Sequence, residues 1–208
     1  MTERPGLFIT LEGGEGAGKS TAAARLAELM RAEGHEVVLT REPGGTPGAE
    51  AIRALLLSTD TSLDALAQTM LHFAARADHV AAVLRPALAR GAVVICDRFY
   101  DSTMAYQAYG MGVDVAVIAS LVRLINLVPD ITFILEVPEF ISKTRLAARG
   151  AASDRYEDMG RDVMLRIAQG FRAIAASEPG RCALIDGTQP VDAVVAEMRR
   201  LVRERRKR

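Results

Sequence analysis

Short hydrophobic runs alternate along the chain with longer stretches in which hydrophobic residues recur at helical spacing. This alternation is typical of strand–helix crossovers, which build a parallel sheet with helices on both faces. The runs are rich in Val, Ile, Leu and Phe, as expected of strands buried on both faces. They predict an α/β fold with strands at Leu7–Glu12, Glu36–Thr40, Ala92–Cys96, Ile131–Val137 and Cys182–Ile185.

Helical spacing fills the segments between these strands. The polar stretch Gly150–Glu157 separates two of the expected helices, and we expect a mobile flap there. Pro86 is expected to bend the longest helix, since proline cannot donate the backbone hydrogen bond of a helix interior. The expected helices are Lys19–Glu33, Gly48–Leu57, Leu63–Arg90, Val113–Asn126, Pro138–Arg149, Asp158–Ser177 and Val191–Arg206.

The length and composition of the chain indicate how many domains it forms and which binding partners are disfavoured. A chain of 208 residues without an internal repeat or a flexible linker is expected to form a single domain over residues 1–208. Lys plus Arg and Asp plus Glu both number 26, so no overall field attracts nucleic acid or an anionic membrane. The basic run from Arg199 to Arg208 is interpreted as a solvated helix end.

The cysteines and the length of the apolar runs indicate where in the cell the protein is expected. Cys96 and Cys182 are the only cysteines and lack a second thiol at metal-ligand spacing, so they are interpreted as reduced structural residues. The sequence shows neither a signal-peptide core nor a run of about 18 apolar residues. We therefore expect no membrane segment and a cytoplasmic location.

Candidate chemistry begins where the first strand ends. The segment GGEGAGKS, Gly13–Ser20, matches G-x-x-x-x-G-K-[ST] between an expected strand and an Ala- and Leu-rich helix. Such glycines let backbone N–H groups converge on phosphate oxygens. Lys19 is then expected to act in catalysis at the β- and γ-phosphates, and Ser20 to bind Mg²⁺. The expected ATP-binding residues are Gly13, Gly14, Glu15, Gly16, Ala17, Gly18, Lys19, Ser20 and Thr21.

A second metal ligand is expected at Asp97, which directly follows the apolar run Ala92–Cys96. A carboxylate at the end of a strand beside a P-loop can hold the metal or its water. The alternative is an ordinary turn residue or helix cap. Because the chain has no Asn-Lys-x-Asp sequence and no suitably placed Asp-x-x-Gly, a GTPase is disfavoured.

Further clusters place arginine near strand ends, where open parallel sheets bind ligands, and they indicate a second, anionic substrate. Arginine suits bidentate phosphate contact, and aromatic rings offer a platform for a base. The clusters are Arg41–Thr46, Phe73 with Arg76, and Asp97–Phe99 with Ser102, Thr103, Tyr106 and Gln107. The structural alternatives are a surface salt bridge from Arg41 to Glu42, pairing of Arg76 with Asp78 or Asp97, and burial of Tyr106 as an ordinary core aromatic.

Taken together, these segments resemble bacterial thymidylate kinase over essentially the full length of the chain. The discriminating segments are Arg41–Thr46 and Asp97–Gln107, and the order and approximate separation of all segments also agree. The matching pieces are Leu11–Gly13, Glu15–Thr21, Thr40–Thr46, Ala74–Arg76, Asp97–Phe99 with Ser102, Ala105, Tyr106 and Gln107, and Asp154–Arg155.

The resemblance implies a nucleoside-monophosphate-kinase fold with a five-stranded parallel sheet, a small lid at about residues 149–157, and a homodimer. The implied reaction is phosphorylation of thymidine monophosphate (dTMP) to the diphosphate by ATP with Mg²⁺, in dTTP synthesis. The resemblance implies that Arg98 and Arg41 bind the dTMP phosphate, that Arg76 reads a thymine carbonyl and that Thr103 contacts the edge of the base. It also implies that Tyr106 packs on the deoxyribose and that Glu15 approaches the sugar 3′-hydroxyl or the metal shell. Further substrate contacts are implied for Pro43 and Gln107.

The resemblance also bears on the catalytic arginine, which family members carry either inside the P-loop or on the lid. Here Gly16 follows Glu15, so the lid is expected to supply the charge. Arg149 and Arg155 are the candidates, and Arg145 is a weaker one.

One position departs from the family, in which a phenylalanine four residues before the base-reading arginine stacks on thymine. That position is His72 here, and Phe73 lies three residues before Arg76. Either ring could cover the base, since both spacings bring a side chain near Arg76 on a helix. We favour Phe73, because an uncharged hydrophobic ring is desolvated more easily.

The sequence is also compatible with two other functions. A kinase for deoxycytidylate or uridylate is the nearest alternative, and a donor at Arg76 favours bases with a carbonyl at the edge over cytosine. A regulatory P-loop ATPase without an acceptor is the alternative from another class. The set Arg41, Arg76 and Arg98 argues against it.

Overall fold

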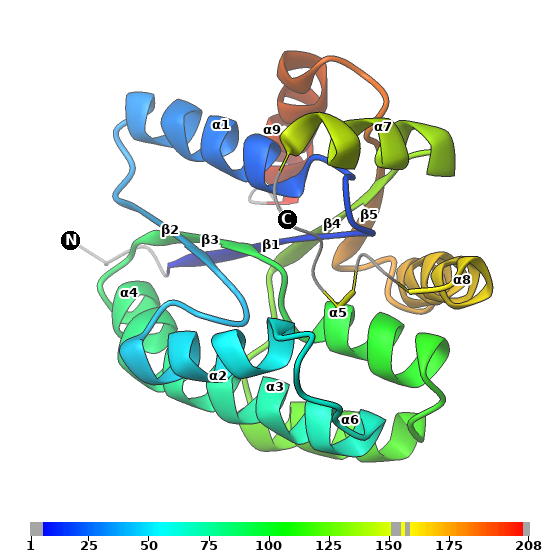
Figure 1. The fold of residues 1–208 in the computed structure, drawn as a ribbon. Helices are drawn as coiled ribbons and strands as arrows, with labels where there is room; N and C mark the ends of the chain where they lie inside the picture. Colours follow the sequence, from blue (N-terminus) through cyan, green and yellow to red (C-terminus); the bar gives the residue numbers. More distant parts are fainter. Residues whose placement is uncertain (1–5, 151–154, 157–158, 206–208) are drawn as a thin grey trace.

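The sheet has the predicted α/β architecture. The computed structural model describes residues 6–150, 155–156 and 159–205. Within this part of the chain, five parallel strands form one sheet in the order β2-β3-β1-β4-β5 (Figure 1). All predicted strands are present, with ends within one residue of prediction: β1 Leu7–Glu12, β2 Val37–Arg41, β3 Val93–Asp97, β4 Ile131–Glu136 and β5 Cys182–Asp186.

Helices cover both faces of the sheet (Figure 1). Helices α1, α7 and α9 lie on one side, and the other helices lie on the opposite side. Their bounds are α1 Lys19–Ala32, α2 Pro47–Leu57, α3 Ala65–His79, α4 Arg85–Ala89, α5 Tyr100–Thr103, α6 Val115–Ile125, α7 Glu139–Arg149, α8 Arg161–Ser177 and α9 Val191–Arg205, with the π-helical segments η1 Val80–Leu84 and η2 Met104–Gly110.

Successive residues of a strand contribute to different cores, because strand side chains alternate between the two faces. In β1, Ile9 and Leu11 join a cluster with residues of α1 and α9. Phe8 points to the other face and meets Phe99 edge to face, with ring centroids 5.0 Å apart. Burial on both faces fixes the strands, so their carboxyl ends form a defined edge.

The long helix predicted at Leu63–Arg90 forms as α3, η1 and α4 in direct succession. Asp64 caps its start, since the Asp64 carboxylate accepts a hydrogen bond of 2.8 Å from Leu66 N. The widened π-helical turn at η1 precedes Pro86, which cannot donate a backbone hydrogen bond. The chain therefore departs from a regular α-helix directly before the proline, in a π-helical segment.

The sequence pattern missed a helix between residues 100 and 110, where α5 continues into η2. Tyr100, Ser102 and Thr103 have weak helix propensity, and the polar members of this segment are buried. A helix whose polar side chains point inward lacks the hydrophobic stripe that periodicity detects. The predicted helix Asp158–Ser177 also begins later, at Arg161, with Gly160 as its N-cap.

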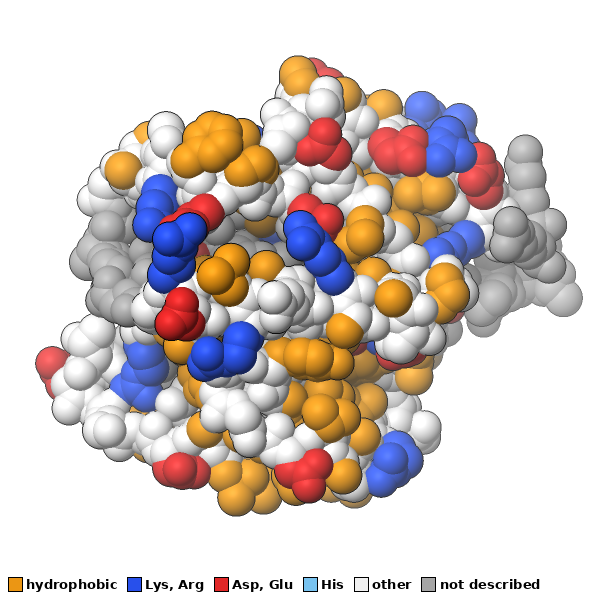
Figure 2. Space-filling model, turned by 90° about the vertical axis from the view of Figure 1, so that its right-hand side faces the viewer, with side chains coloured by type: hydrophobic (Ala, Val, Ile, Leu, Met, Phe, Trp, Pro, Cys, Tyr) orange, Lys and Arg blue, Asp and Glu red, His pale blue; other side chains and the backbone are white. Residues whose placement is uncertain are grey.

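The surface agrees with the neutral overall charge. On the face drawn in Figure 2, positive, negative and hydrophobic side chains are interspersed, with more hydrophobic ones in the lower half. Cys96 and Cys182 are both buried and free. Among the described residues, no helix combines the length and apolar character that crossing a bilayer requires.

Candidate active site

The loop between β1 and α1 has the backbone geometry of a phosphate cradle. Gly13, Gly16 and Gly18 adopt positive φ angles of 130°, 69° and 93°, which side chains with a Cβ rarely tolerate. A Cβ at Gly13 would lie 2.4 Å from the carbonyl oxygen of Leu135. Backbone conformation therefore requires glycine at all three positions, and the lack of space requires it at Gly13 as well.

The loop lysine is held inside the site. Lys19 is buried, and its Nζ donates a hydrogen bond of 2.7 Å to the carbonyl oxygen of Gly14. Burial first, and then the nearby charge of Arg98, lowers the pKa of Lys19. A buried ammonium group on the P-loop is suited to binding an anion, because the negative charge offsets the cost of burying the positive one.

Ser20 and Asp97 meet at the head of α1. The Ser20 hydroxyl donates a hydrogen bond to Asp97 Oδ2, while Asp97 Oδ1 is buried and has no hydrogen-bond partner within the described part of the chain. Oxygen ligands of this kind are the ones that Mg²⁺ prefers. The pair therefore fits a divalent cation, as the sequence predicted for these positions.

Arg98 lies at the centre of a polar network between β3 and the P-loop. It has a φ of 70°, a left-handed conformation that is uncommon for a residue with a side chain. Arg98 Nη1 donates to Gly13 O and to Ser102 Oγ, both at 2.9 Å. Arg98 Nη2 donates to Glu15 Oε1 at 2.5 Å, and the Tyr106 hydroxyl donates to the same Glu15 oxygen at 3.0 Å.

Glu12 at the end of β1 supports this network, a role that was not predicted from the sequence. Its Oε1 accepts a hydrogen bond of 2.8 Å from Phe99 N, and its Oε2 accepts one of 2.5 Å from Ser102 Oγ. Burial, followed by the charge of Asp101, raises the pKa of Glu12 to about 8. These bonds hold the segment from Phe99 to Ser102, which directly follows Arg98.

Arg41 reaches the same edge of the sheet from β2, where it pairs in register with Asp97. Its guanidinium forms an ion pair of 3.1 Å with Glu50. The alternative interpretation of the sequence, a surface salt bridge from Arg41 to Glu42, is therefore not what the structure shows. The following loop is tied to α2, because Arg53 Nη1 donates a hydrogen bond of 2.8 Å to Pro43 O. Arg53 was not singled out from the sequence.

Arg76 is buried at the far end of the site. Its Nε donates to Glu42 Oε2 at 2.7 Å and its Nη2 to Thr103 Oγ1 at 3.1 Å, so it does not pair with Asp78 or Asp97. Within the described residues, Arg76 Nη1 is buried and has no hydrogen-bond partner. A buried donor without a partner is unusual and marks a position for a ligand acceptor.

His72 and Phe73 occupy different environments. His72 lines a cavity, and its Nε2 lies 2.8 Å from the hydroxyl of Tyr156. Burial first, and then the charge of Arg76, lowers the pKa of His72 to about 3, so its ring is neutral. Phe73 packs in the hydrophobic core and supports Arg76, whose guanidinium lies 4.6 Å from the Phe73 ring centroid. This geometry does not support the preference for Phe73 as the base-stacking residue.

A cavity of about 180 Å³ joins these groups, and we call it the arginine cavity after Arg41, Arg53, Arg76 and Arg98 in its wall. The predicted positions that also line it are Glu15, Lys19, Ser20, Pro43, His72, Asp97, Thr103, Tyr106 and Gln107. The wall also contains Glu42, Phe99 and Ser102 from the predicted clusters, and Arg53, Leu57 and Tyr156, to which the sequence assigned no role. Phe73 is absent from this wall.

A second cavity, of about 480 Å³, lies on the other side of the P-loop, and we call it the P-loop cavity. Its wall includes the loop from Glu15 to Thr21 together with Arg145. Glu15, Lys19 and Ser20 line both cavities. Two ligands bound in these cavities would therefore meet at Lys19.

The candidate arginines of the lid region lie in different surroundings. Arg155 Nη2 donates a hydrogen bond of 2.7 Å to Ser58 O, and Arg155 lines neither cavity. Arg145 Nη1 donates to Ala17 O at 3.3 Å. Arg149 ends α7, its side chain lies outside the described part of the chain, and so do residues 151–154 and 157–158 of the expected lid.

Position 16 is closed to a larger residue. An ideal Cβ at Gly16 would lie 2.7 Å from Ser142 O, and the Ser142 hydroxyl donates a hydrogen bond of 2.7 Å to Glu15 O. The start of α7 therefore packs directly against the P-loop.

A P-loop, a fitting metal position and an adjoining cavity rich in arginine define a P-loop kinase that phosphorylates a small anionic acceptor. Comparison with known proteins gives the family. The thymidylate kinase profile matches residues 11–198, and the chain belongs to the thymidylate kinase family, whose members phosphorylate dTMP to the diphosphate with ATP.

Individual relatives agree over nearly the whole chain. A thymidylate kinase of Gluconobacter oxydans is 50% identical over 203 residues, covering 96% of this chain and 95% of the relative. One from Caulobacter vibrioides is 47% identical, covering 96% of this chain and 97% of the relative. A crystal structure of thymidylate kinase from Ehrlichia chaffeensis superposes with a TM-score of 0.80 at 34% identity, over 96% of this chain and 100% of that one.

Proposed function

We propose that ATP with Mg²⁺ binds in the P-loop cavity and dTMP binds in the arginine cavity, with their reacting phosphates at Lys19. The observation that carries this assignment is the wall shared by the two cavities, Glu15, Lys19 and Ser20. Phosphoryl transfer requires donor, transferred group and acceptor to lie in line. The wall shared by the two cavities, with the buried ammonium group of Lys19, would bring the donor and acceptor phosphates together in this way.

The acceptor end is assigned from charge and geometry. Arg98 and Arg41 bind the dTMP phosphate, because both line the arginine cavity at the carboxyl ends of β2 and β3. Arg98 is preorganised by Gly13 and Ser102, so little reorganisation is needed when the phosphate binds. The acceptor is already a phosphate oxygen, and no side-chain nucleophile is required.

The base end is assigned to Arg76, Thr103 and His72. Arg76 Nη1 donates to a thymine carbonyl, since it is the buried donor without a partner within the described chain. His72 covers the base with its neutral ring, in agreement with the family register. Tyr106 packs on the deoxyribose and Glu15 faces the sugar, because both line the same cavity between Arg98 and Arg76.

The cation and the catalytic arginine complete the site. Ser20 and Asp97 hold Mg²⁺, which when bound neutralises charge on the donor phosphates. Arg155 or Arg149 supplies charge to the transferred group when the lid closes, which requires Arg155 to leave the carbonyl of Ser58. Closure then also excludes water from the reacting phosphates.

A homodimer and a cytoplasmic location belong to the same proposal. Leu66 and Met70 of α3 are 44% and 50% exposed, and Leu124 on the neighbouring α6 is 79% exposed. Hydrophobic side chains gathered on adjacent helices are suited to a partner subunit. Light scattering of a Met70→Glu variant tests this, since the variant should be monomeric if α3 lies in the interface.

The substrate assignment is tested with an acceptor panel. ADP release from ATP is followed with dTMP, dUMP, dCMP and dGMP, using Lys19→Ala as the matched inactive control. We expect dTMP to give the highest kcat/KM, dUMP less, and dCMP at least about tenfold less, as the loss of one good hydrogen bond predicts. Equal turnover with and without every acceptor would contradict the assignment.

A further inference from the structure

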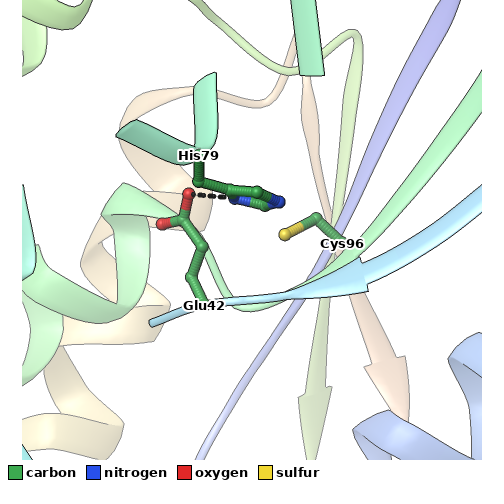
Figure 3. A group of neighbouring side chains, drawn as sticks. All are labelled: Glu42, His79 and Cys96. Atoms are coloured by element: carbon green, nitrogen blue, oxygen red, sulfur yellow. Dashed lines mark hydrogen bonds and ion pairs between the residues drawn. The ribbon is translucent and has the colours of Figure 1, made fainter. Parts of the chain in front are cut away.

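Glu42, His79 and Cys96 form a buried cluster behind the base end of the arginine cavity (Figure 3). Their carboxylate oxygen, imidazole nitrogen and thiol sulfur lie within 4.8 Å of one another, and these are ligand types that zinc uses. However, Arg76 contacts the same carboxylate, and burial raises the pKa of the Cys96 thiol well above its ordinary value. A neighbouring cation and a protonated thiol both disfavour a metal, so the cluster is better explained as a hydrogen-bond network.

Glu42 is the centre of that network. Its Oε2 accepts from Arg76 Nε at 2.7 Å, and its Oε1 lies 3.0 Å from His79 Nδ1, the contact drawn as a dashed line in Figure 3. The Glu42 and Arg76 side chains are each 2% exposed. With Nδ1 donating to Glu42, His79 Nε2 accepts from the Thr40 hydroxyl 2.8 Å away. Each carboxylate oxygen therefore has its own partner.

Arg76 is held on every side except the one that faces the cavity. Glu42 takes Nε, Thr103 takes Nη2 at 3.1 Å, and the rings of Phe73 and Phe99 lie 4.6 and 5.2 Å from the guanidinium carbon. Within the described residues, Nη1 alone among these nitrogens lacks a partner. The contacts leave this donor in one orientation.

We propose that Glu42 is a positioning residue that determines base specificity through Arg76, an inference that rests on the base-reading role proposed above. Glu42 fixes the guanidinium so that Nη1 points at the base. Its negative charge also balances the positive charge of Arg76. The far end of the cavity therefore offers one donor without net charge, which suits a neutral base carbonyl and not a second phosphate.

The experiment compares the dissociation constants of dTMP and dCMP, measured by calorimetry on the full chain. The two ligands share sugar and phosphate and differ only in the base, because dCMP has an amino group in place of a carbonyl, an N3 without a proton and no methyl group. Their ratio therefore reports base reading. We expect Arg76→Ala and Glu42→Ala each to reduce the dTMP preference by about tenfold or more. The double variant should lose no more than Arg76→Ala alone, because Glu42 acts through Arg76.

Two further variants keep the test decisive. Glu42→Asp retains the charge but withdraws the carboxylate by one methylene, and it should reduce the preference less than Glu42→Ala while folding more readily. Asp101→Asn is the matched structural control, since it disrupts another buried pair, in which Asp101 is 3% exposed and lies 2.6 Å from Arg181. It should lower Tm and leave the dTMP to dCMP ratio unchanged.

The outcomes separate the two proposals. If both Glu42 variants lower Tm but keep the preference while Arg76→Ala loses it, the positioning role of Glu42 is wrong and base reading by Arg76 stands. If Arg76→Ala keeps the preference, base reading itself is wrong. A double variant with a clearly larger loss than Arg76→Ala would show that Glu42 acts independently of Arg76.

Discussion

Replacing His72 and Phe73 in turn tests which ring covers the base. His72 lines the arginine cavity with a neutral ring, so His72→Ala should weaken dTMP binding while the fold changes little. Base stacking on an aromatic ring contributes about 1–3 kcal/mol, which corresponds to roughly 5- to 150-fold in Kd. His72→Phe should restore most of the affinity, because it keeps a ring at the same position.

Phe73→Ala should have the opposite profile. Phe73 is 5% exposed in the hydrophobic core, and truncation of such a ring costs about 3–5 kcal/mol of stability. For a chain of this length that corresponds to a fall in Tm of roughly 6–20 °C. Affinity for dTMP should fall less than in His72→Ala, because Phe73 does not contact the base and affects binding only by packing against Arg76.

The assays are titration calorimetry with dTMP and thermal unfolding of each variant. Phe73→Leu serves as the milder core variant if Phe73→Ala does not fold. The reasoning is refuted if Phe73→Leu weakens dTMP more than His72→Ala does, or if His72→Phe binds no better than His72→Ala. Tyr156→Phe separates stacking from the 2.8 Å contact between His72 and Tyr156, since it removes only that hydroxyl.

Three further outcomes are expected. Lys19→Ala should lower kcat/KM for ATP by at least ~10²-fold in the ADP-release assay, and near-normal turnover would contradict the P-loop assignment. Arg155→Ala should lower kcat far more than dTMP affinity in steady-state kinetics, whereas full activity in both Arg155→Ala and Arg149→Ala would contradict a lid arginine. His72 has a folded pKa of about 3 against an ordinary 6.5, so its contribution to stability is complete above pH 6.5 and is lost as pH falls toward 3, by up to about 1.4 kcal/mol per pH unit. Urea unfolding of His72→Phe should therefore show a shallower acid decline between pH 6.5 and 4 than the wild type, and equal slopes would contradict the low pKa.

The fold was largely predictable because its determinants are local. Strands such as Leu7–Glu12 are continuous apolar runs bounded by turn residues, and the P-loop is fixed by spacing within eight residues. The helix at residues 100–110 was not predictable in this way. Several of its inward polar side chains line the cavity, among them Ser102, Thr103 and Gln107, and their burial removes the periodic signal.

The site residues that were missed depend on contacts between distant segments. Glu12 and Phe99 are 87 positions apart, and Glu42 and Arg76 are 34 apart. Nothing in the local pattern shows that these carboxylates fix the two arginines. Likewise, the choice between His72 and Phe73 depends on which face of α3 the core occupies, and hydrophobicity alone favours the ring that the core takes.

The contact between Gly16 and the start of α7 restricts how this lineage can evolve. An arginine at position 16, the P-loop location of the catalytic arginine in some family members, would have its Cβ 2.7 Å from Ser142 O. The φ of 69° at Gly16 adds backbone strain to that clash. A single codon change at this position is therefore deleterious before it can be useful. Relatives with an arginine at this position are therefore expected to hold the start of α7 farther from the P-loop.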